Sequence, residues 1–139
     1  MLTHDVQQAL LTWYDDHQRE LPWRLTNDPW AILLSEVLLQ QTQVSRGMVY
    51  WQRMVDAFPT VGSMAQAPVD AVLKAWEGAG YYSRARRLHA LSQRVMLSSS
   101  EGGFDGRLPS SYDELLSLPG IGPYTAAAVA SIAFGQPVA

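Results

Sequence analysis

The chain has 139 residues, a formal net charge of −3, 47% hydrophobic residues and 17% charged residues, a balance typical of one folded domain rather than a disordered segment. The acidic balance excludes nucleic-acid binding through bulk charge alone, and the absence of cysteine excludes disulfides and thiolate metal sites within these residues. No apolar run reaches the ~18 residues needed to cross a bilayer, and no signal-peptide pattern opens the chain, so we expect a cytoplasmic protein without a membrane partner.

The first half of the chain predicts helices separated by short breaks. A helix is expected over about residues 3–17, followed by the connection "RELPWRLTNDPW". Asp28 then caps a helix that has Pro29 at its first position and ends near Gln41. The next helix stops at Pro59, because proline cannot continue the hydrogen-bond ladder.

The second half continues the same pattern without a convincing strand, so the fold class is all-α. A capping box at Ser111 and Glu114 opens a short helix, and Pro123 opens the last one. The remaining expected elements are a short helical turn at 60–68 and helices at 68–80 and 81–97.

The segment "LPGIGPYTAAAV" places two glycines around one apolar residue between two helices. Gly120 and Gly122 are expected to adopt backbone angles that a Cβ would forbid, while Ile121 plugs the turn into the core. Backbone N–H groups at the start of the following helix would then form an uncharged seat for a phosphate. The alternative is an ordinary helix–helix turn with a glycine cap.

The segment "SEVLLQQTQV" carries one acid in a helix that is apolar nearly all round. Glu36 has no cationic residue three or four positions away, so the helix itself offers it no ion partner. Burial would raise the pKa of this carboxyl and allow it to hold a proton, as a general acid requires. The alternative is a glutamate at the helix rim that faces water or pairs with a distant arginine.

Three of the nine arginines gather in "YYSRARRLHAL", as Arg84, Arg86 and Arg87. They favour a nucleic-acid contact and a solvated helix face equally. Of the two tyrosines that precede them, Tyr82 is expected in the core.

These motifs resemble a known family. "LPGIGPYTAAAV" is similar to the helix–hairpin–helix motif of DNA glycosylases, and "SEVLLQQTQV" and "GAGYYSRARRLH" resemble the adenine DNA glycosylases of the MutY type. The similarity also includes "LPWR" and "FPTV" and covers essentially the whole chain, as the N-terminal part of a catalytic domain. It implies a helix–hairpin–helix glycosylase fold with three parts: 1–24, a helix packed on a second, cluster-type lobe whose remainder is absent; 25–135, a six-helix lobe with the hairpin at about 113–134; and 136–139, the start of a truncated continuation.

The resemblance implies a monofunctional base-excision-repair enzyme that flips adenine out of duplex DNA and hydrolyses its N-glycosidic bond when it is mispaired with 8-oxoguanine or guanine. Glu36 matches the acid that protonates adenine. Tyr124 matches a tyrosine that supports the sugar, where strand-nicking relatives carry a lysine that forms a Schiff base. The family's second carboxylate would lie just past Ala139, so we expect residues 1–139 alone to be inactive.

The remaining site residues are likewise implied by the resemblance. Gln41 matches a residue that wedges into the duplex, and Tyr81 matches an intercalating tyrosine. The base pocket would involve Arg19, Trp23 and Arg24. Further DNA contacts would come from Leu39, Gln40, Thr42, Gly120, Ile121, Gly122 and Thr125.

The family also implies a [4Fe–4S] cluster, whose cysteine ligands are absent from this chain, and a monovalent or divalent cation on the hairpin's backbone carbonyls. No side-chain metal site is predicted. The expected partner is double-stranded DNA with an A:8-oxoguanine or A:G mispair, bound by a monomer. A glycosylase for another base and a non-catalytic DNA-binding fragment are the alternatives.

Overall fold

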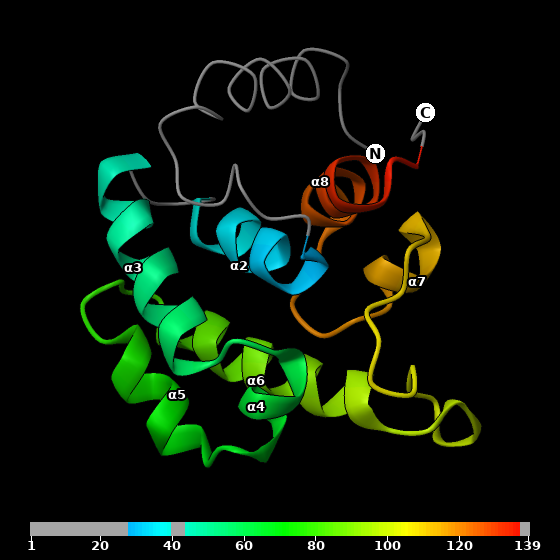
Figure 1. Ribbon diagram of the computed structural model, residues 1–139, viewed down its shortest axis with the longest axis horizontal. Coiled ribbons are helices and arrows are strands. Elements are labelled where there is room, and N and C mark those ends of the chain that lie inside the picture. Colours follow the sequence, from blue (N-terminus) through cyan, green and yellow to red (C-terminus); the bar gives the residue numbers. More distant parts are fainter. Residues whose placement is uncertain (1–27, 40–43, 137–139) are drawn as a thin grey trace.

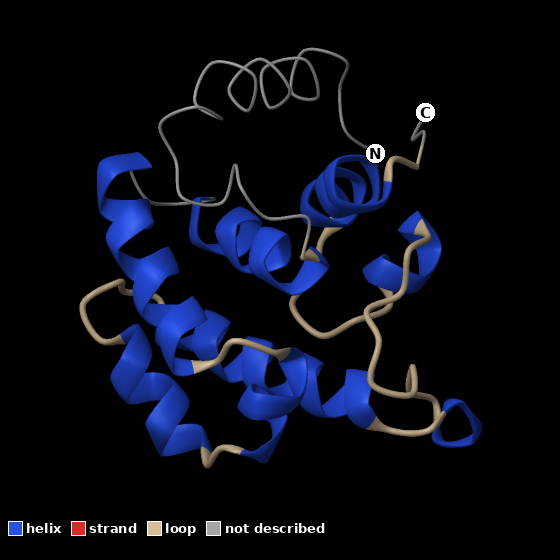
Figure 2. Cartoon of the chain, viewed as in Figure 1, coloured by secondary structure: helices blue, strands red, loops and turns tan. Residues whose placement is uncertain are grey.

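The computed structural model describes residues 28–39 and 44–136, and within these ranges the chain forms helices and turns but no strand (Figures 1 and 2). The all-α prediction is confirmed. The helices are α2 (Pro29–Leu39), α3 (Val44–Ala57), α4 (Val61–Gln66), α5 (Val69–Trp76), α6 (Tyr82–Met96), α7 (Tyr112–Leu116) and α8 (Pro123–Phe134), with a 3₁₀ turn η2 (Ser99–Glu101). Helix α4 lies within the short helical turn expected at 60–68, and the other six α-helices of the described residues match the helices that the sequence predicts. The helix predicted at 3–17 lies outside the described residues.

Side-chain caps start the helices where the sequence predicts them. The Asp28 carboxylate accepts the N–H of Trp30 at 3.1 Å ahead of α2. The Ser111 hydroxyl accepts the N–H of Glu114 at 3.2 Å and opens α7. Gly135, with a φ of 64°, closes α8 in the left-handed conformation.

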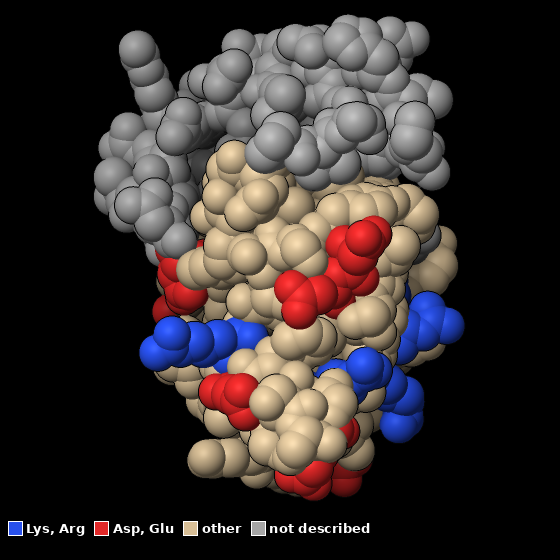
Figure 3. All heavy atoms as spheres, turned by 90° about the vertical axis from the view of Figure 1, so that its right-hand side faces the viewer, with Lys and Arg blue, Asp and Glu red and all other residues tan. Residues whose placement is uncertain are grey.

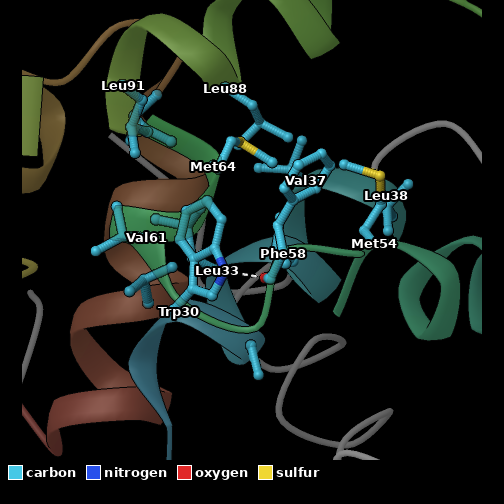
Figure 4. Close-up of a cluster of buried hydrophobic side chains, with 14 of the residues drawn as sticks. Trp30, Leu33, Val37, Leu38, Met54, Phe58, Val61, Met64, Leu88 and Leu91 are labelled. Carbon is cyan, nitrogen blue, oxygen red and sulfur yellow. Dashed lines mark hydrogen bonds between the residues drawn. The ribbon is translucent and has the colours of Figure 1, made fainter. Parts of the chain in front are cut away.

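Helix α2 lies at the centre of the described fold, between α3 and α8 (Figure 1). Every residue from Trp30 to Leu38 is buried, which confirms that this helix is enclosed on nearly all sides. Figure 4 shows its side chains meeting those of α3, α4 and α6, with the Trp30 indole N–H donating to the Phe58 carbonyl at 2.9 Å. This packing fixes the position of any polar group that α2 carries.

The hairpin of α7 and α8 packs beside α2 through α8, while α6 packs on α4 and α5. Figure 3 shows acidic and basic side chains interspersed on the face it presents, without one sign dominating. Among the described helices, none combines the length and apolarity that a bilayer crossing requires.

Candidate active site and nucleic-acid interface

Among the residues that the structure describes, Glu36 is the one buried acid, with 2% of its surface exposed. It lies on α2, which packs directly against α8. Tyr124 occupies the second position of α8 and is partly buried. Burial, followed by the negative charge of Glu36, raises the pKa of the Tyr124 phenol. The structure therefore brings together the two residues that the sequence analysis singled out as catalytic, and it keeps the phenol protonated.

The turn before α8 is built as the sequence predicts at two of its three central positions. Gly120 has a φ of +76°, which a residue with a Cβ rarely adopts. Ile121 is 7% exposed, belongs to the hydrophobic core, and donates its N–H to the Leu118 carbonyl at 3.2 Å. The apolar plug is confirmed, and it leaves the backbone on either side of Ile121 at the surface.

Gly122 differs from its prediction. Its φ of −90° and ψ of 178° are open to any residue, and no atom lies within 4 Å of the place a Cβ would take. The expected forbidden backbone angle is therefore wrong for Gly122. What the missing side chain provides is open space outside the turn.

Two further residues predicted to contact DNA are less exposed than such a role suggests. Thr125 is fully buried behind the turn, so its side chain offers no surface to a ligand. Leu39, the last residue of α2, is half-buried against the core. The burial of Thr125 does not support the predicted DNA contact, because the first turn of α8 directs this side chain into the protein.

Tyr81 is the most unusual exposed residue of the described chain. It has a φ of 53° and a ψ of 60°, in the left-handed region, and 65% of its surface is exposed. The Trp76 indole N–H donates to the Gly80 carbonyl at 2.7 Å and holds the preceding backbone. A bulky residue in this conformation is costly, and such strain collects at functional sites.

Three residues of α3, which the sequence motifs do not single out, lie against the same turn. Arg46 donates to the Gly78 carbonyl at 3.0 Å, and Arg53 donates to the Glu77 carbonyl at 2.8 Å. Both guanidinium groups lie over the Tyr50 ring, 5.9 and 5.0 Å from its centroid. Arg46, Tyr50 and Arg53 are spaced four and three residues apart, which places them on one face of α3, and this spacing could have indicated their contact from the sequence.

Tyr82 was expected in the core but is 44% exposed. Its hydroxyl accepts the N–H of Gly78 at 3.3 Å, so it closes the glycine turn from outside. Periodicity alone could not show this, because the first turn of α6 extends beyond the core that the rest of α6 covers.

A pocket of about 220 Å³ lies between α6, the hairpin turn and α2. Arg84, half-buried with its guanidinium 5.9 Å from the Trp76 ring centroid, forms part of the wall, and burial lowers its pKa. Arg87 and Ser83 also line it. The other lining residues are Val37, Tyr81, Leu88, Pro119, Gly120 and Ile121.

Several predicted site residues lie outside the described ranges: Arg19, Trp23, Arg24, Gln40, Gln41 and Thr42. Within residues 28–39 and 44–136, no group of three or more His, Asp or Glu side chains could hold a metal ion. The 139 residues contain no cysteine, so they do not supply ligands for a [4Fe–4S] cluster. The cation on the hairpin carbonyls stays a prediction.

Comparison with known proteins connects this geometry to a family. Residues 34–136 match the family model described as HhH-GPD superfamily base excision DNA repair protein. The chain is 45% identical over 126 residues to the adenine DNA glycosylase of Mycolicibacterium smegmatis and 42% identical over 136 residues to that of Homo sapiens. These alignments cover 90% and 92% of this chain, which spans only 41% and 24% of the two relatives.

Solved structures agree on the fold. A thermostable thymine-DNA glycosylase superposes with a TM-score of 0.75 at 30% identity, over 93% of this chain and 58% of that one. A trapped covalent endonuclease III–DNA intermediate superposes with a TM-score of 0.71 at 26% identity, over 99% of this chain and 63% of that one.

Proposed function

Because the chain belongs to the HhH-GPD superfamily of base excision DNA repair proteins, we propose that the protein carrying it is an adenine DNA glycosylase. It acts on double-stranded DNA and removes adenine mispaired with 8-oxoguanine or guanine. The observation that carries the proposal is Glu36, an acid enclosed in α2 beside Tyr124 of the hairpin helix.

Glu36 serves as the general acid in this mechanism. Cleavage of the N-glycosidic bond leaves negative charge on the departing adenine, and a proton delivered to N7 neutralises it. Charge stabilisation is most effective where water is excluded, and a 2% exposed carboxyl is in such a place. The adenine must leave the stack to reach it, because a paired base is out of reach.

Tyr124 supports the hydrolytic form of the reaction. A phenol has no amine, so it cannot form the Schiff base through which strand-nicking glycosylases act. With its pKa raised, the phenol stays neutral and can donate a hydrogen bond near the sugar. Water is then the nucleophile, and the second carboxylate that the family resemblance implies would stabilise the sugar cation.

Tyr81 and the hairpin turn support duplex DNA as the partner. An exposed aromatic ring next to a glycine turn can insert beside a base, while the hairpin turn meets the DNA backbone. The adenine relatives favour the base, and the likeness to a thymine-DNA glycosylase keeps thymine as the second candidate.

The test uses the full-length protein. Single-turnover assays compare duplexes containing A:8-oxoguanine, A:G, A:T and T:G. We expect release of adenine from the first two and a strand that breaks only after alkaline treatment. Release of thymine from T:G alone would assign the second candidate, and strand breakage without alkali would contradict the hydrolytic mechanism. Residues 1–139 alone should release little adenine.

A further inference from the structure

The pocket between α6 and the hairpin turn combines groups that recognise a phosphate beside an aromatic ring. Arg84 and Arg87 supply positive charge, Ser83 supplies a hydroxyl, and the ring of Tyr81 stands at the same pocket. None of the nine described residues that line it is acidic, so no carboxylate among them competes with an anion. Cations and an exposed aromatic side by side are the usual surroundings of a nucleotide on a protein.

Arg87 is the lining residue best placed for an anion. Its aliphatic stem packs on the hairpin: a Cβ built on Gly120 would lie 2.8 Å from the Arg87 Cβ and 3.2 Å from its Cδ. Arg87 is exposed, and it forms no hydrogen bond or ion pair with any described residue, so none of these residues occupies the five donors of its guanidinium.

Arg84 has a different part in the pocket. Its guanidinium is half-buried near the Trp76 ring and makes interactions of its own. It contributes a fixed positive charge to the wall, while Arg87 can move to meet a ligand from the exposed side.

We propose that this pocket binds one backbone phosphate of duplex DNA through the guanidinium of Arg87, next to the nucleotide beside which Tyr81 inserts. The proposal rests on the proposed function and adds a charged contact to a hairpin turn that otherwise offers only backbone groups. The left-handed Gly120 then has a second purpose, since its missing Cβ leaves room for the Arg87 stem.

The test is the salt dependence of DNA binding by the full-length protein, measured by fluorescence anisotropy on an undamaged duplex. Arg87→Gln keeps most of the stem and removes the charge. Each lost phosphate contact flattens the plot of log affinity against log salt by about 0.9, so we expect that change and an affinity about tenfold lower in low salt. The loss should be equal for A:8-oxoguanine and undamaged duplexes, because a backbone contact reads no sequence.

The neighbouring arginine provides a matched control. Arg86 is exposed on the same helix and does not line the pocket, so Arg86→Gln should leave the slope nearly unchanged. Arg87→Lys should restore most of the slope, since it returns the charge. Equal slopes for Arg87→Gln and Arg86→Gln would overturn the proposal, provided circular dichroism shows both variants folded; Arg87→Ala serves the same comparison if Arg87→Gln does not fold.

Free phosphate is the other source of the same chemistry. At constant ionic strength, inorganic phosphate should displace DNA no better than chloride does. Displacement that is stronger and depends on Arg87 would assign the pocket to free phosphate and overturn the DNA assignment. These outcomes are separate from base excision: a wild-type protein that excises adenine while Arg87→Gln binds normally contradicts this inference alone.

Discussion

Two turns in the described residues have the same Gly-x-Gly sequence pattern but expose different groups. Gly78 to Gly80 joins α5 to α6, and Gly120 to Gly122 joins α7 to α8; each is a Gly-x-Gly between a shorter and a longer helix. In the first turn the middle residue is Ala79, and the tyrosine that follows stands 65% exposed in the left-handed conformation. In the second, Ile121 is buried and only backbone lies at the surface.

The difference shows that a Gly-x-Gly turn can present either a side chain or the polypeptide backbone at the surface. Arg46 and Arg53 hold the first turn from outside and the buried Trp76 holds it from inside, and so the turn can project Tyr81. The second is held from inside by Ile121, and the missing Cβ of Gly122 leaves open space outside the turn. On this account the first turn separates bases and the second meets the phosphate backbone.

The largest change in the free energy of unfolding is expected from a substitution in the second turn. Gly120→Ala places a Cβ at a φ of +76° and against Arg87, and should lower the free energy of unfolding by about 2–3 kcal/mol. Gly122→Ala is the matched control: its backbone is extended and its surroundings open, so stability should change by no more than about 1 kcal/mol. Urea denaturation of the full-length variants measures both.

The same pair separates folding from binding. Gly122→Ala should weaken DNA binding in spite of its normal stability, because the new Cβ enters the space left for the DNA backbone. Unchanged DNA affinity in Gly122→Ala would argue that this face does not meet DNA.

The next effect tests the strained tyrosine. Tyr81→Asn puts a residue that tolerates the left-handed region in its place, and should raise the free energy of unfolding by about 0.5–1 kcal/mol. It should also weaken binding to duplex DNA, since stacking on an aromatic ring contributes about 1–3 kcal/mol per base. Tyr82→Asn, in the adjacent helical position, should lose stability instead. A loss of stability in both variants would contradict the claim that the left-handed conformation of Tyr81 destabilises the folded protein.

The smallest effect concerns the tyrosine that follows the second turn. The pKa of Tyr124 is raised in the folded protein, so above the ordinary tyrosine pKa of about 10 the unfolded chain releases this proton first. Stability should therefore fall as the pH rises from about 10 through the raised value. In urea denaturation at about pH 9 to 11, around the reference tyrosine pKa, the free energy of unfolding of Tyr124→Phe should fall less steeply with pH. An equally steep fall in the variant would contradict a raised pKa for Tyr124.

Local chemistry in the sequence predicted much of this fold. The caps at Asp28 and Ser111 act between near neighbours, and the burial of α2 and of Ile121 follows from the type and spacing of their residues; all are confirmed. The helices therefore begin close to where the pattern placed them.

Contacts between residues that are distant in the sequence could not be predicted from its local patterns. The stem of Arg87 against Gly120, the brace from Arg46 to Gly78, and Glu36 acting on Tyr124 each join residues more than 30 positions apart. The exposure of Tyr82 and the burial of Thr125 depend on the same packing. The role proposed for Glu36 therefore rests on both the family resemblance and the contact between α2 and α8.

The most direct test of the central claim is the single-turnover rate of adenine release by full-length Glu36→Gln on an A:8-oxoguanine duplex. Ser35→Ala is the control, a buried polar residue one position away whose hydroxyl donates to the Ile32 carbonyl at 2.6 Å. Loss of a general acid should slow Glu36→Gln by about 10²- to 10⁴-fold while it still binds the duplex, and Ser35→Ala should keep nearly the wild-type rate. A Glu36→Gln protein that releases adenine as fast as Ser35→Ala would contradict the account.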